Sequence, residues 1–408
     1  MHVSNTLIAI LAGSRVSDRR SLAEQRLTAN VLFLLAALAA LGALATNIIL
    51  PAFPAMGEDL GVSVRELSAT LTSFFLAFAL GQLFVGPLSD RFGRQRLVLI
   101  GLVIFIIGCL VCAVASTLPQ LIGGRVIQAL GVCATSVLSR AIARDLFDGQ
   151  ELARALSLTM VAMAAAPGFS PLLGGAFNSW LGWRAMFGFV GVLAVLLAVH
   201  YIATLGETHR ADKRSALSVL AILKIYQQLL IDRRFIAPAL SVSLVIGALY
   251  AFFAMAPAIL MNGFDFSPFE LGLFFASTVF VVFGAGFLAP RLAQRWGPVP
   301  VARAGIIIAL AGSVALLTAK EDIFLFSAFL TVFLLGMGLV NPLGTAIALQ
   351  PFGRNAGAAS ALLGFFQMGC AALSISIAAA LHFPAYTSLG IILTANLTLS
   401  FLVFLVLR

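Results

Sequence analysis

Residues 86–96 read GPLSDRFGRQR and set the carboxylate of Asp90 among three arginines. Arginine and carboxylate form short charge-assisted hydrogen bonds, so this spacing favours a reversible ionic contact over catalysis. We expect the flanking glycines to allow tight backbone geometry and close helix approach. The stretch predicts a gating cluster that holds one face closed and then releases it, with an ordinary positively charged turn as the alternative. We assign to this cluster Gly86, Asp90, Arg91, Gly93, Arg94 and Arg96, together with the later pair Arg144 and Asp145.

A second pattern is the isolated pair Arg125 and Gln128, which lies inside an apolar run. Residues three apart share one face of a helix. A charge near mid-membrane costs about 2.5–3.5 kcal/mol on insertion scales, so it usually faces a watery cavity. We therefore predict a substrate cavity, with a structural arginine that snorkels or bonds helix-end carbonyls as the alternative. The predicted cavity residues are Asn47, Phe74, Arg125, Gln128, Tyr250, Phe253, Asn341 and Gln367.

Enzymatic patterns are not evident in the sequence. The spacing Cys109-x-x-Cys112 could suggest metal or redox chemistry, but no second pair or matching histidine accompanies it, so we interpret both as packing residues. The chain has four histidines, and none of its 16 acidic residues falls deep within an apolar run. We therefore expect no catalytic residue, metal or cofactor, and the protein is not expected to be an enzyme.

The composition explains how these residues are positioned. The chain has 408 residues, of which 61% are hydrophobic, and a mean hydropathy of +1.07, more than a soluble protein could cover with polar surface. A membrane helix needs about 17–25 apolar residues. Twelve runs satisfy this, at about 28–52, 66–88, 97–116, 120–139, 153–177, 184–205, 235–260, 269–290, 299–318, 322–347, 356–381 and 387–407.

The basic residues predict the orientation. If both termini lie on one side, that side holds 21 of the 25 lysines and arginines. The positive-inside rule then makes it cytoplasmic, in a multi-pass protein of the inner membrane. Contact with anionic lipid accounts for the net charge of +9, so nucleic acid is not needed as a partner.

The connection at 206–234 is the longest and lies at the middle of the chain. Shifting the sequence by 204 residues aligns Ser63, Glu66 and Gly93 with Ser267, Glu270 and Gly297, as expected for a transporter made of two related halves. We predict an all-α membrane protein with twelve transmembrane helices in two pseudo-symmetric six-helix bundles. Its parts are a cytoplasmic tail (1–27), an N-terminal bundle (28–205), a cytoplasmic linker (206–234) and a C-terminal bundle (235–408).

The cluster at 86–96 resembles the signature Gly-x-x-x-Asp-Arg-x-Gly-Arg-x-Arg of the major facilitator superfamily. GRVIQALG at 124–131 is similar to the family's Arg-x-x-Gln-x-x-Gly pattern. APGFSPLLGG at 166–175 is similar to the antiporter signature of drug exporters, carried here by Pro167, Gly168, Pro171, Gly174 and Gly175. SRAIARDLFDGQELARALS at 139–157 and WLGWRAMF at 180–187 look like the bicyclomycin-resistance type of drug:proton antiporter.

This resemblance implies a monomeric secondary transporter that exports small amphipathic molecules, drug-like compounds or a secreted metabolite, by alternating access coupled to protons. Exporters of this type commonly carry an acidic residue where this chain has Asn47, and asparagine cannot titrate. Two alternatives follow: an exporter of an organic anion such as a siderophore with non-standard coupling, or a solute importer of the same superfamily. Glu66, Glu270, Asp90 and His200 are candidates for the coupling group.

Overall fold

The computed structural model describes residues 29–209 and 219–405, and all regular elements in these ranges are helical. The predicted tail at 1–27 and the middle of the linker lie outside the described residues. The first part contains α2 (Ala29–Asn47), η1 (Leu50–Ala52), α3 (Phe53–Leu60), α4 (Val64–Phe92), α5 (Arg94–Ala113), α6 (Leu118–Leu146), α7 (Gly149–Leu181) and α8 (Trp183–Thr204). The second contains α9 (Val219–Ile231), α10 (Arg233–Ala256), η3 (Pro257–Met261), α11 (Pro268–Trp296), α12 (Pro298–Thr318), α13 (Ile323–Leu349), η4 (Gln350–Asn355), α14 (Ala356–Ala380) and α15 (Ala385–Leu405).

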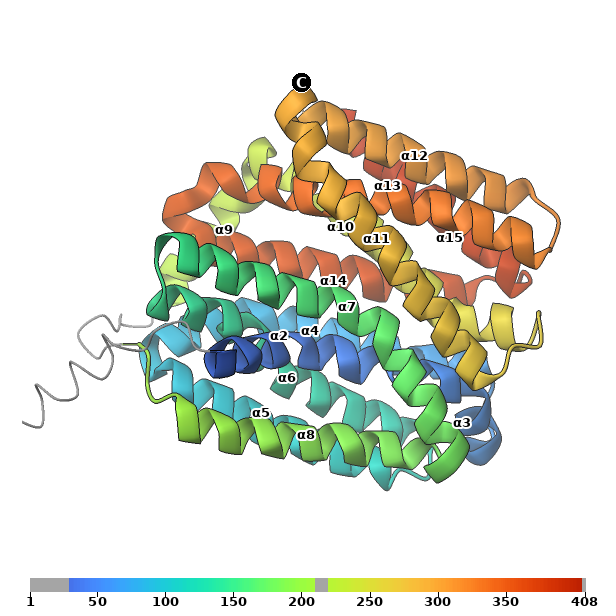
Figure 1. Cartoon of the computed structure of the whole chain (residues 1–408), viewed down its shortest axis with the longest axis horizontal. Coiled ribbons are helices and arrows are strands. Elements are labelled where there is room, and N and C mark those ends of the chain that lie inside the picture. Colours follow the sequence, from blue (N-terminus) through green and yellow to red (C-terminus); the bar gives the residue numbers. More distant parts are fainter. Residues whose placement is uncertain (1–28, 210–218, 406–408) are drawn as a thin grey trace, which may run out of the picture.

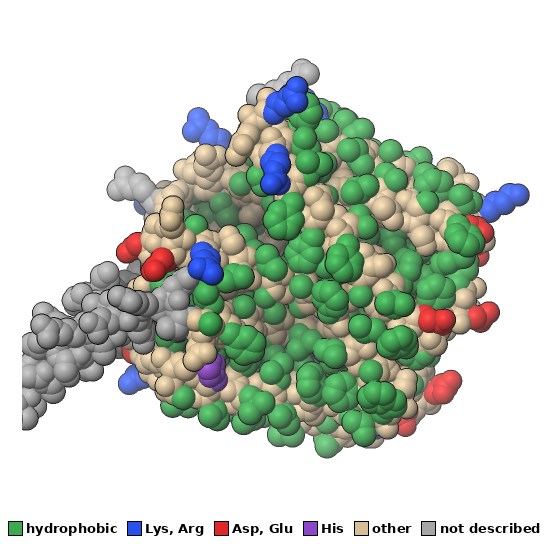
Figure 2. Space-filling view, viewed as in Figure 1, with side chains coloured by type: hydrophobic (Ala, Val, Ile, Leu, Met, Phe, Trp, Pro, Cys, Tyr) green, Lys and Arg blue, Asp and Glu red, His purple; other side chains and the backbone are tan. Residues whose placement is uncertain are grey.

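Twelve spans in the described ranges are long and apolar enough to cross a membrane, which confirms the predicted number. Hydrophobic side chains cover the visible outer surface, and charged ones lie toward its two ends (Figure 2). In lipid, helices satisfy their own backbone hydrogen bonds, which is why each apolar run is helical. Several helices continue past the predicted limits. For example, α6 runs to Leu146, because a helix can extend beyond the apolar core into the polar interface.

The first span is interrupted, whereas the sequence suggested one continuous helix over 28–52. Helix α2 ends at Asn47, and the chain then passes through η1 into α3. Pro51 stands four residues after Asn47 and has no N–H to offer its carbonyl, so the helical ladder cannot continue. The carbonyls in the last turn of α2 therefore need other partners.

The spans form two groups of six, α2–α8 and α10–α15, which lie below and above one another in Figure 1. Within the first group α6 packs on α4 and α5, and within the second α12 packs on α13 and α10 on α15. The most extensive contacts between the groups join α4 with α14 and α7 with α11. We call the face where α8 leads toward α9 the linker face, and the opposite face, where α3 lies, the far face.

The two groups repeat local structure at the shift of 204 residues. Ser63 and Glu66 form a capping box at the start of α4, and Ser267 and Glu270 form the same box at the start of α11. Each glutamate accepts a hydrogen bond from its serine N–H at 2.8 Å. Both helices are 29 residues long and end at glycines with positive φ, 96° at Gly93 and 84° at Gly297. The glutamates therefore cap helices, and this role accounts for them without proton coupling.

Glycines on α7 allow close backbone approach at the far-face half of the molecule. A Cβ at Gly174 would lie 1.9 Å from the carbonyl oxygen of Ile48, just after the end of α2. A Cβ at Gly168 would lie 1.7 Å from Cγ2 of Val279, and one at Gly175 would lie 2.5 Å from the carbonyl oxygen of Pro268. The last two contacts join α7 to α11, so α7 holds the two groups of spans in contact.

We predict that Gly174→Ala destabilises the protein by roughly 1–3 kcal/mol, because the added methyl group must displace the backbone at Ile48. Both partners belong to the first six spans, so rocking of the two groups does not relieve this clash. The melting temperature of the purified protein in detergent measures the effect. The matched control is Gly188→Ala in α8, where a Cβ meets nothing within 4 Å and helix propensity favours alanine. Equal melting temperatures for the two variants would contradict the prediction.

Candidate functional site

A cavity of about 480 Å³ opens at the linker face between the two groups of spans. Its walls come from α4, α6 and α9, from Arg94 at the start of α5, and from the segment 355–361, where η4 leads into α14. The charged side chains that line it are Asp90, Arg94, Arg140 and Arg144, and the polar ones include Gln82, Ser89, Tyr226, Asn355 and Ser360. The cavity wall thus carries three cations and one anion among the residues described.

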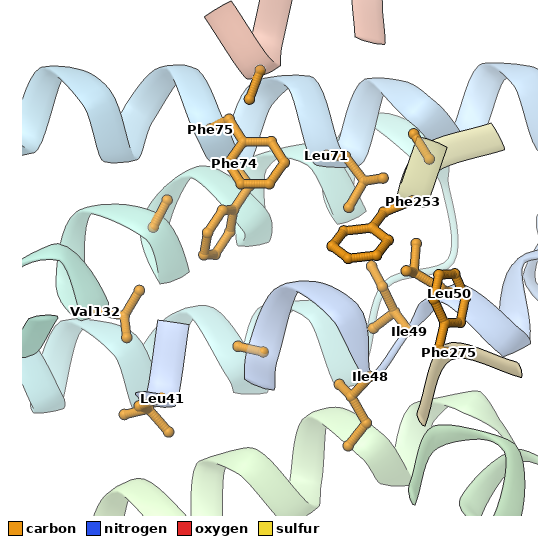
Figure 3. Close-up of a cluster of buried hydrophobic side chains, with 14 of the residues drawn as sticks. Leu41, Ile48, Ile49, Leu50, Leu71, Phe74, Phe75, Val132, Phe253 and Phe275 are labelled. Atoms are coloured by element: carbon orange, nitrogen blue, oxygen red, sulfur yellow. The ribbon is translucent and has the colours of Figure 1, made fainter. Parts of the chain in front are cut away.

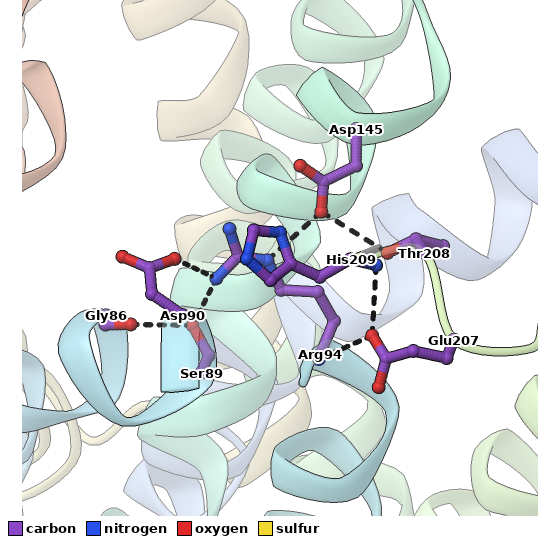
Figure 4. Close-up of polar contacts among 8 residues, drawn as sticks. All are labelled: Gly86, Ser89, Asp90, Arg94, Asp145, Glu207, Thr208 and His209. Carbon is purple, nitrogen blue, oxygen red and sulfur yellow. Dashed lines mark hydrogen bonds and ion pairs between the residues drawn. The ribbon is translucent and has the colours of Figure 1, made fainter. Parts of the chain in front are cut away.

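Arg94 is the centre of a polar network at the edge of this cavity (Figure 4). Its Nη1 donates to Asp90 Oδ1 at 2.5 Å and to Ser89 Oγ, and its Nε donates to Asp145 Oδ2 at 3.0 Å. The Arg94 side chain is 9% exposed, whereas that of Asp90 is 47% exposed, so the contacts are shielded from water mainly on the arginine side. Asp90 and Asp145 come from α4 and α6, and Arg94 therefore ties three helices together.

The segment just after α8 completes the network. The Arg94 N–H donates to Glu207 Oε1 at 2.8 Å, and Thr208 Oγ1 donates to Asp145 Oδ2 at 3.3 Å. The His209 N–H also donates to Glu207 Oε1, at 3.0 Å. Glu207, Thr208 and His209 were not predicted as site residues, because they are far from Arg94 in sequence. Their position directly after a span, in a charged connection, was the available signal.

The predicted gating residues divide into those that join the network and those that do not. Asp90, Arg94 and Asp145 join it, and Arg144 lines the cavity beside it. Arg91 and Arg96 are exposed, and the Arg91 guanidinium lies over the ring of Phe92 at 5.2 Å. Among described residues the network partners belong to the first six spans and the start of the linker. The ionic contact therefore does not reach across to the second group in this conformation.

The two glycines of the cluster behave differently. Gly93 has φ 96° and ψ 155°, so it permits the sharp connection between α4 and α5, as expected. The prediction of close helix approach is wrong for Gly86 in this conformation. A Cβ there would meet nothing within 4 Å, because Gly86 faces the cavity, although its carbonyl accepts a hydrogen bond from Ser89 Oγ at 2.7 Å.

Arg125 lies at the centre of the first six spans and is completely buried. Its Nη1 donates to the carbonyl of Ala45 at 3.0 Å and to Gln128 Oε1 at 2.7 Å, while the guanidinium lies 4.3 Å from the ring centroid of Phe74. Ala45 belongs to the last turn of α2, where the Leu44 carbonyl still accepts from the Ile48 N–H at 3.0 Å, and the Ala45 carbonyl accepts from Arg125 instead. The guanidinium thus caps the interrupted first span, which is the alternative role considered from the sequence.

The Arg125 side chain keeps unused hydrogen-bonding capacity. In the described part of the chain, its Nε and Nη2 have no partner, nor has Asn47 Oδ1, although Asn47 Nδ2 donates to the carbonyl of Ala43 at 2.8 Å. Among described residues, no carboxylate forms an ion pair with Arg125. The nearest cavity-lining residue on the same helix is Val137, twelve residues or about 18 Å further along α6. In this conformation, therefore, Arg125 does not line the cavity.

The predicted aromatic cavity residues Phe74, Tyr250 and Phe253 instead belong to one chain of ring contacts, which we call the aromatic plug. Figure 3 shows Phe74, Phe75, Phe253 and Phe275 among other buried apolar side chains. The rings of Phe75 and Tyr250 are 4.4 Å apart and join α4 to α10, and Phe253 packs on Phe275 at 5.3 Å. Phe74 contacts Phe75 at 5.9 Å and so connects Arg125 to this plug. The two polar candidates of the second group, Asn341 and Gln367, are partly exposed and make no side-chain hydrogen bond to a described residue.

We predict that Arg125→Leu lowers stability by about 1–3 kcal/mol, because the Ala45 carbonyl and Gln128 lose a charged donor. The loss is measured as a lower melting temperature of the purified protein. Arg154→Leu is the control, since Arg154 is an exposed arginine on α7. A melting temperature of Arg125→Leu equal to or above that of the parent protein would show that the guanidinium does not support the end of α2.

A model of the Major Facilitator Superfamily matches residues 32–375. The chain is 32% identical over 343 residues to the uncharacterized MFS-type transporter YdgK of Bacillus subtilis, covering 82% of this chain and 85% of that protein. It is 27% identical over 361 residues to the bicyclomycin resistance protein homolog of Haemophilus influenzae, covering 88% and 91%. A bacterial homolog of the human lysosomal transporter Spinster, in an inward-facing and unoccupied conformation, has a similar fold at 16% identity, with a TM-score of 0.73 over 94% of this chain and 97% of that one.

These similarities extend over most of the chain and agree with its twelve spans. The relatives include a resistance protein of the type that the motifs resemble. The chain is a multi-pass membrane transporter rather than an enzyme, and it belongs to the Major Facilitator Superfamily.

Proposed function

We propose that the protein exports small amphipathic molecules from the cell across the inner membrane by alternating access. The observation that carries this proposal is the asymmetry between the two faces. At the far face α7 packs on α11 and the aromatic plug fills the space between the groups, whereas at the linker face a cavity opens between them. The bundles at 28–205 and 235–408 are then the moving parts, joined by the linker at 206–234.

The direction follows from the assignment of the faces. The arginine-rich linker face is cytoplasmic in this proposal, with both termini on that side. A substrate enters the cavity from the cytoplasm or the inner leaflet, and the bundles then rock to open the far face. Resistance proteins among the relatives support a drug-like substrate. In this proposal the transporter works as a monomer embedded in the lipid bilayer.

Proton coupling is the energy source we propose, carried by a group outside the first span, because Asn47 cannot titrate. Glu66 and Glu270 are occupied as helix caps. Asp90 is the carboxylate that lines the cavity among described residues, and it is held by Arg94. Protonation of Asp90 would weaken this ion pair and release the network at the linker face, which links proton binding to the movement of the bundles.

An exporter of organic anions is the second candidate. Arg94, Arg140 and Arg144 line the cavity, and Arg125 keeps two unused donors deeper in the first six spans. A carboxylate-bearing solute such as a siderophore would meet the arginines of the cavity wall first and Arg125 deeper in the first six spans. Transport assays with substrates of opposite charge separate this candidate from a cationic-drug exporter.

We predict that expression in a pump-deficient bacterial host raises resistance to at least one compound in a panel of amphipathic antibiotics that includes bicyclomycin and chloramphenicol. Asp90→Asn is expected to lower the export rate about tenfold, because it removes the titratable partner of Arg94. Minimum inhibitory concentrations and efflux from preloaded cells measure the two effects.

Asp148→Asn is the matched control, since Asp148 is exposed and makes no cap hydrogen bond at the start of α7. Equal amounts of each variant in the membrane are verified by immunoblot. Increased sensitivity on expression would indicate import and contradict the proposed direction. Full activity of Asp90→Asn across a range of external pH would contradict its role in coupling.

A further inference from the structure

Arg140 and Arg144 are the two cations of the linker-face cavity that no described carboxylate holds. We propose that they bind the acidic head group, a carboxylate or phosphate, of an amphipathic molecule whose apolar part occupies the same cavity. This proposal concerns binding and does not depend on the direction of transport or on its coupling. The two arginines were not predicted as a binding pair from the sequence, where Arg144 was assigned only to gating.

The positions of the two arginines support this inference. Arg140 and Arg144 are four residues apart on α6, so they project from the same face of the helix, and both line the cavity. Among described residues, neither takes part in an ion pair, and neither donates a side-chain hydrogen bond. By contrast, Arg94 on the same wall is fully engaged with Asp90 and Asp145. Two guanidinium groups without a described partner therefore line the same open cavity.

The acidic groups nearby are already occupied. Asp90 lines the cavity, but its carboxylate is held by Arg94 at 2.5 Å. Asp145 and Glu207 contact Arg94 as well, and neither lines the cavity. In the described part of the chain, the cavity wall therefore keeps an excess of positive charge. A bound anion would balance this excess of positive charge. Guanidinium groups bind carboxylate and phosphate by paired hydrogen bonds.

The cavity wall also has an apolar part, which the linker helix α9 helps to form. Ile222 and Ile225 of α9 line the cavity together with Val137 and Leu138 of α6. Helix α9 is attached to α4 by the Tyr226 hydroxyl, which donates to the carbonyl of Leu83 at 2.9 Å. Burial raises the pKa of Tyr226 to about 12.

This combination of features defines the chemical class of the ligand. The cavity of about 480 Å³ falls in the range of pockets that hold small organic ligands, about 300–1,000 Å³. A wall that combines apolar side chains with two arginines outside any described ion pair matches a single acidic head on an apolar body. Such a head could belong to an anionic phospholipid of the inner leaflet or to a solute carrying a carboxylate, and the chemistry of recognition is shared.

The test uses the full-length protein in nanodiscs of phosphatidylcholine, titrated with decanoate, and with decyltrimethylammonium as a probe of equal chain length and opposite charge. Binding is measured by the shift in melting temperature and by isothermal titration calorimetry. We expect decanoate to bind and Arg140→Gln/Arg144→Gln to weaken it about tenfold or more. We expect Arg140→Lys/Arg144→Lys to keep part of the affinity, and the exposed control Arg154→Gln to keep all of it.

A second arm identifies the source of the head group. Replacing part of the phosphatidylcholine by phosphatidylglycerol should reduce decanoate binding if a lipid head occupies the site, and should leave it unchanged if the site takes soluble anions. Both results support the arginine site. It would be overturned if the double glutamine variant bound decanoate as tightly as the parent protein, or if decyltrimethylammonium bound equally well. Arg144→Gln alone, at an exposed position, serves if the double variant does not fold.

Discussion

The close contact of α7 with α11 is the constraint on which the arrangement of the two bundles depends. Gly168 and Gly175 approach α11 so closely that a Cβ at either would collide, and Gly272 does the same from α11, where a Cβ would lie 2.5 Å from Cα of Leu172. Without hydrophobic driving force between helices in lipid, such small residues let backbones pack by van der Waals contact. We call this contact of α7 with α11 the seam. The seam holds the two groups together at the far face, and the cavity therefore opens at the linker face.

The Arg125 side chain supports the fold and, among described residues, also keeps donor atoms without a partner. The break after Asn47 leaves carbonyls without helical donors, and the guanidinium supplies one to Ala45 from a different span. Because burial of a cation is costly, this contact, the bond to Gln128 and the ring of Phe74 together make the position tolerable. Two donors on Nε and Nη2 remain, so a ligand reaching this depth after the plug opens would find them free.

The number of spans and their helical nature could be predicted from the sequence, because lipid leaves few alternatives for long apolar runs. The repeat was visible in paired residues such as Ser63 and Ser267, whose identical caps the structure reveals. The partners of Arg94 could be predicted in part. Asp90 is four residues away, whereas Glu207 lies 113 residues further along the chain and is brought close by tertiary packing. Whether Arg125 lines an open cavity depends on the conformational state, which a pattern of residue types does not encode.

The central claim is that the seam at the far face and the cavity at the linker face exchange during transport. Pulsed electron paramagnetic resonance tests it most directly, in a variant with its four cysteines replaced and spin labels placed at exposed positions. One pair, at 96 and 295, reports on the linker face, and the other, at 58 and 321, on the far face. On adding substrate or changing pH, the account predicts that the first distance shortens while the second lengthens. Fixed distances in every condition, or two distances that change in the same direction, would contradict it.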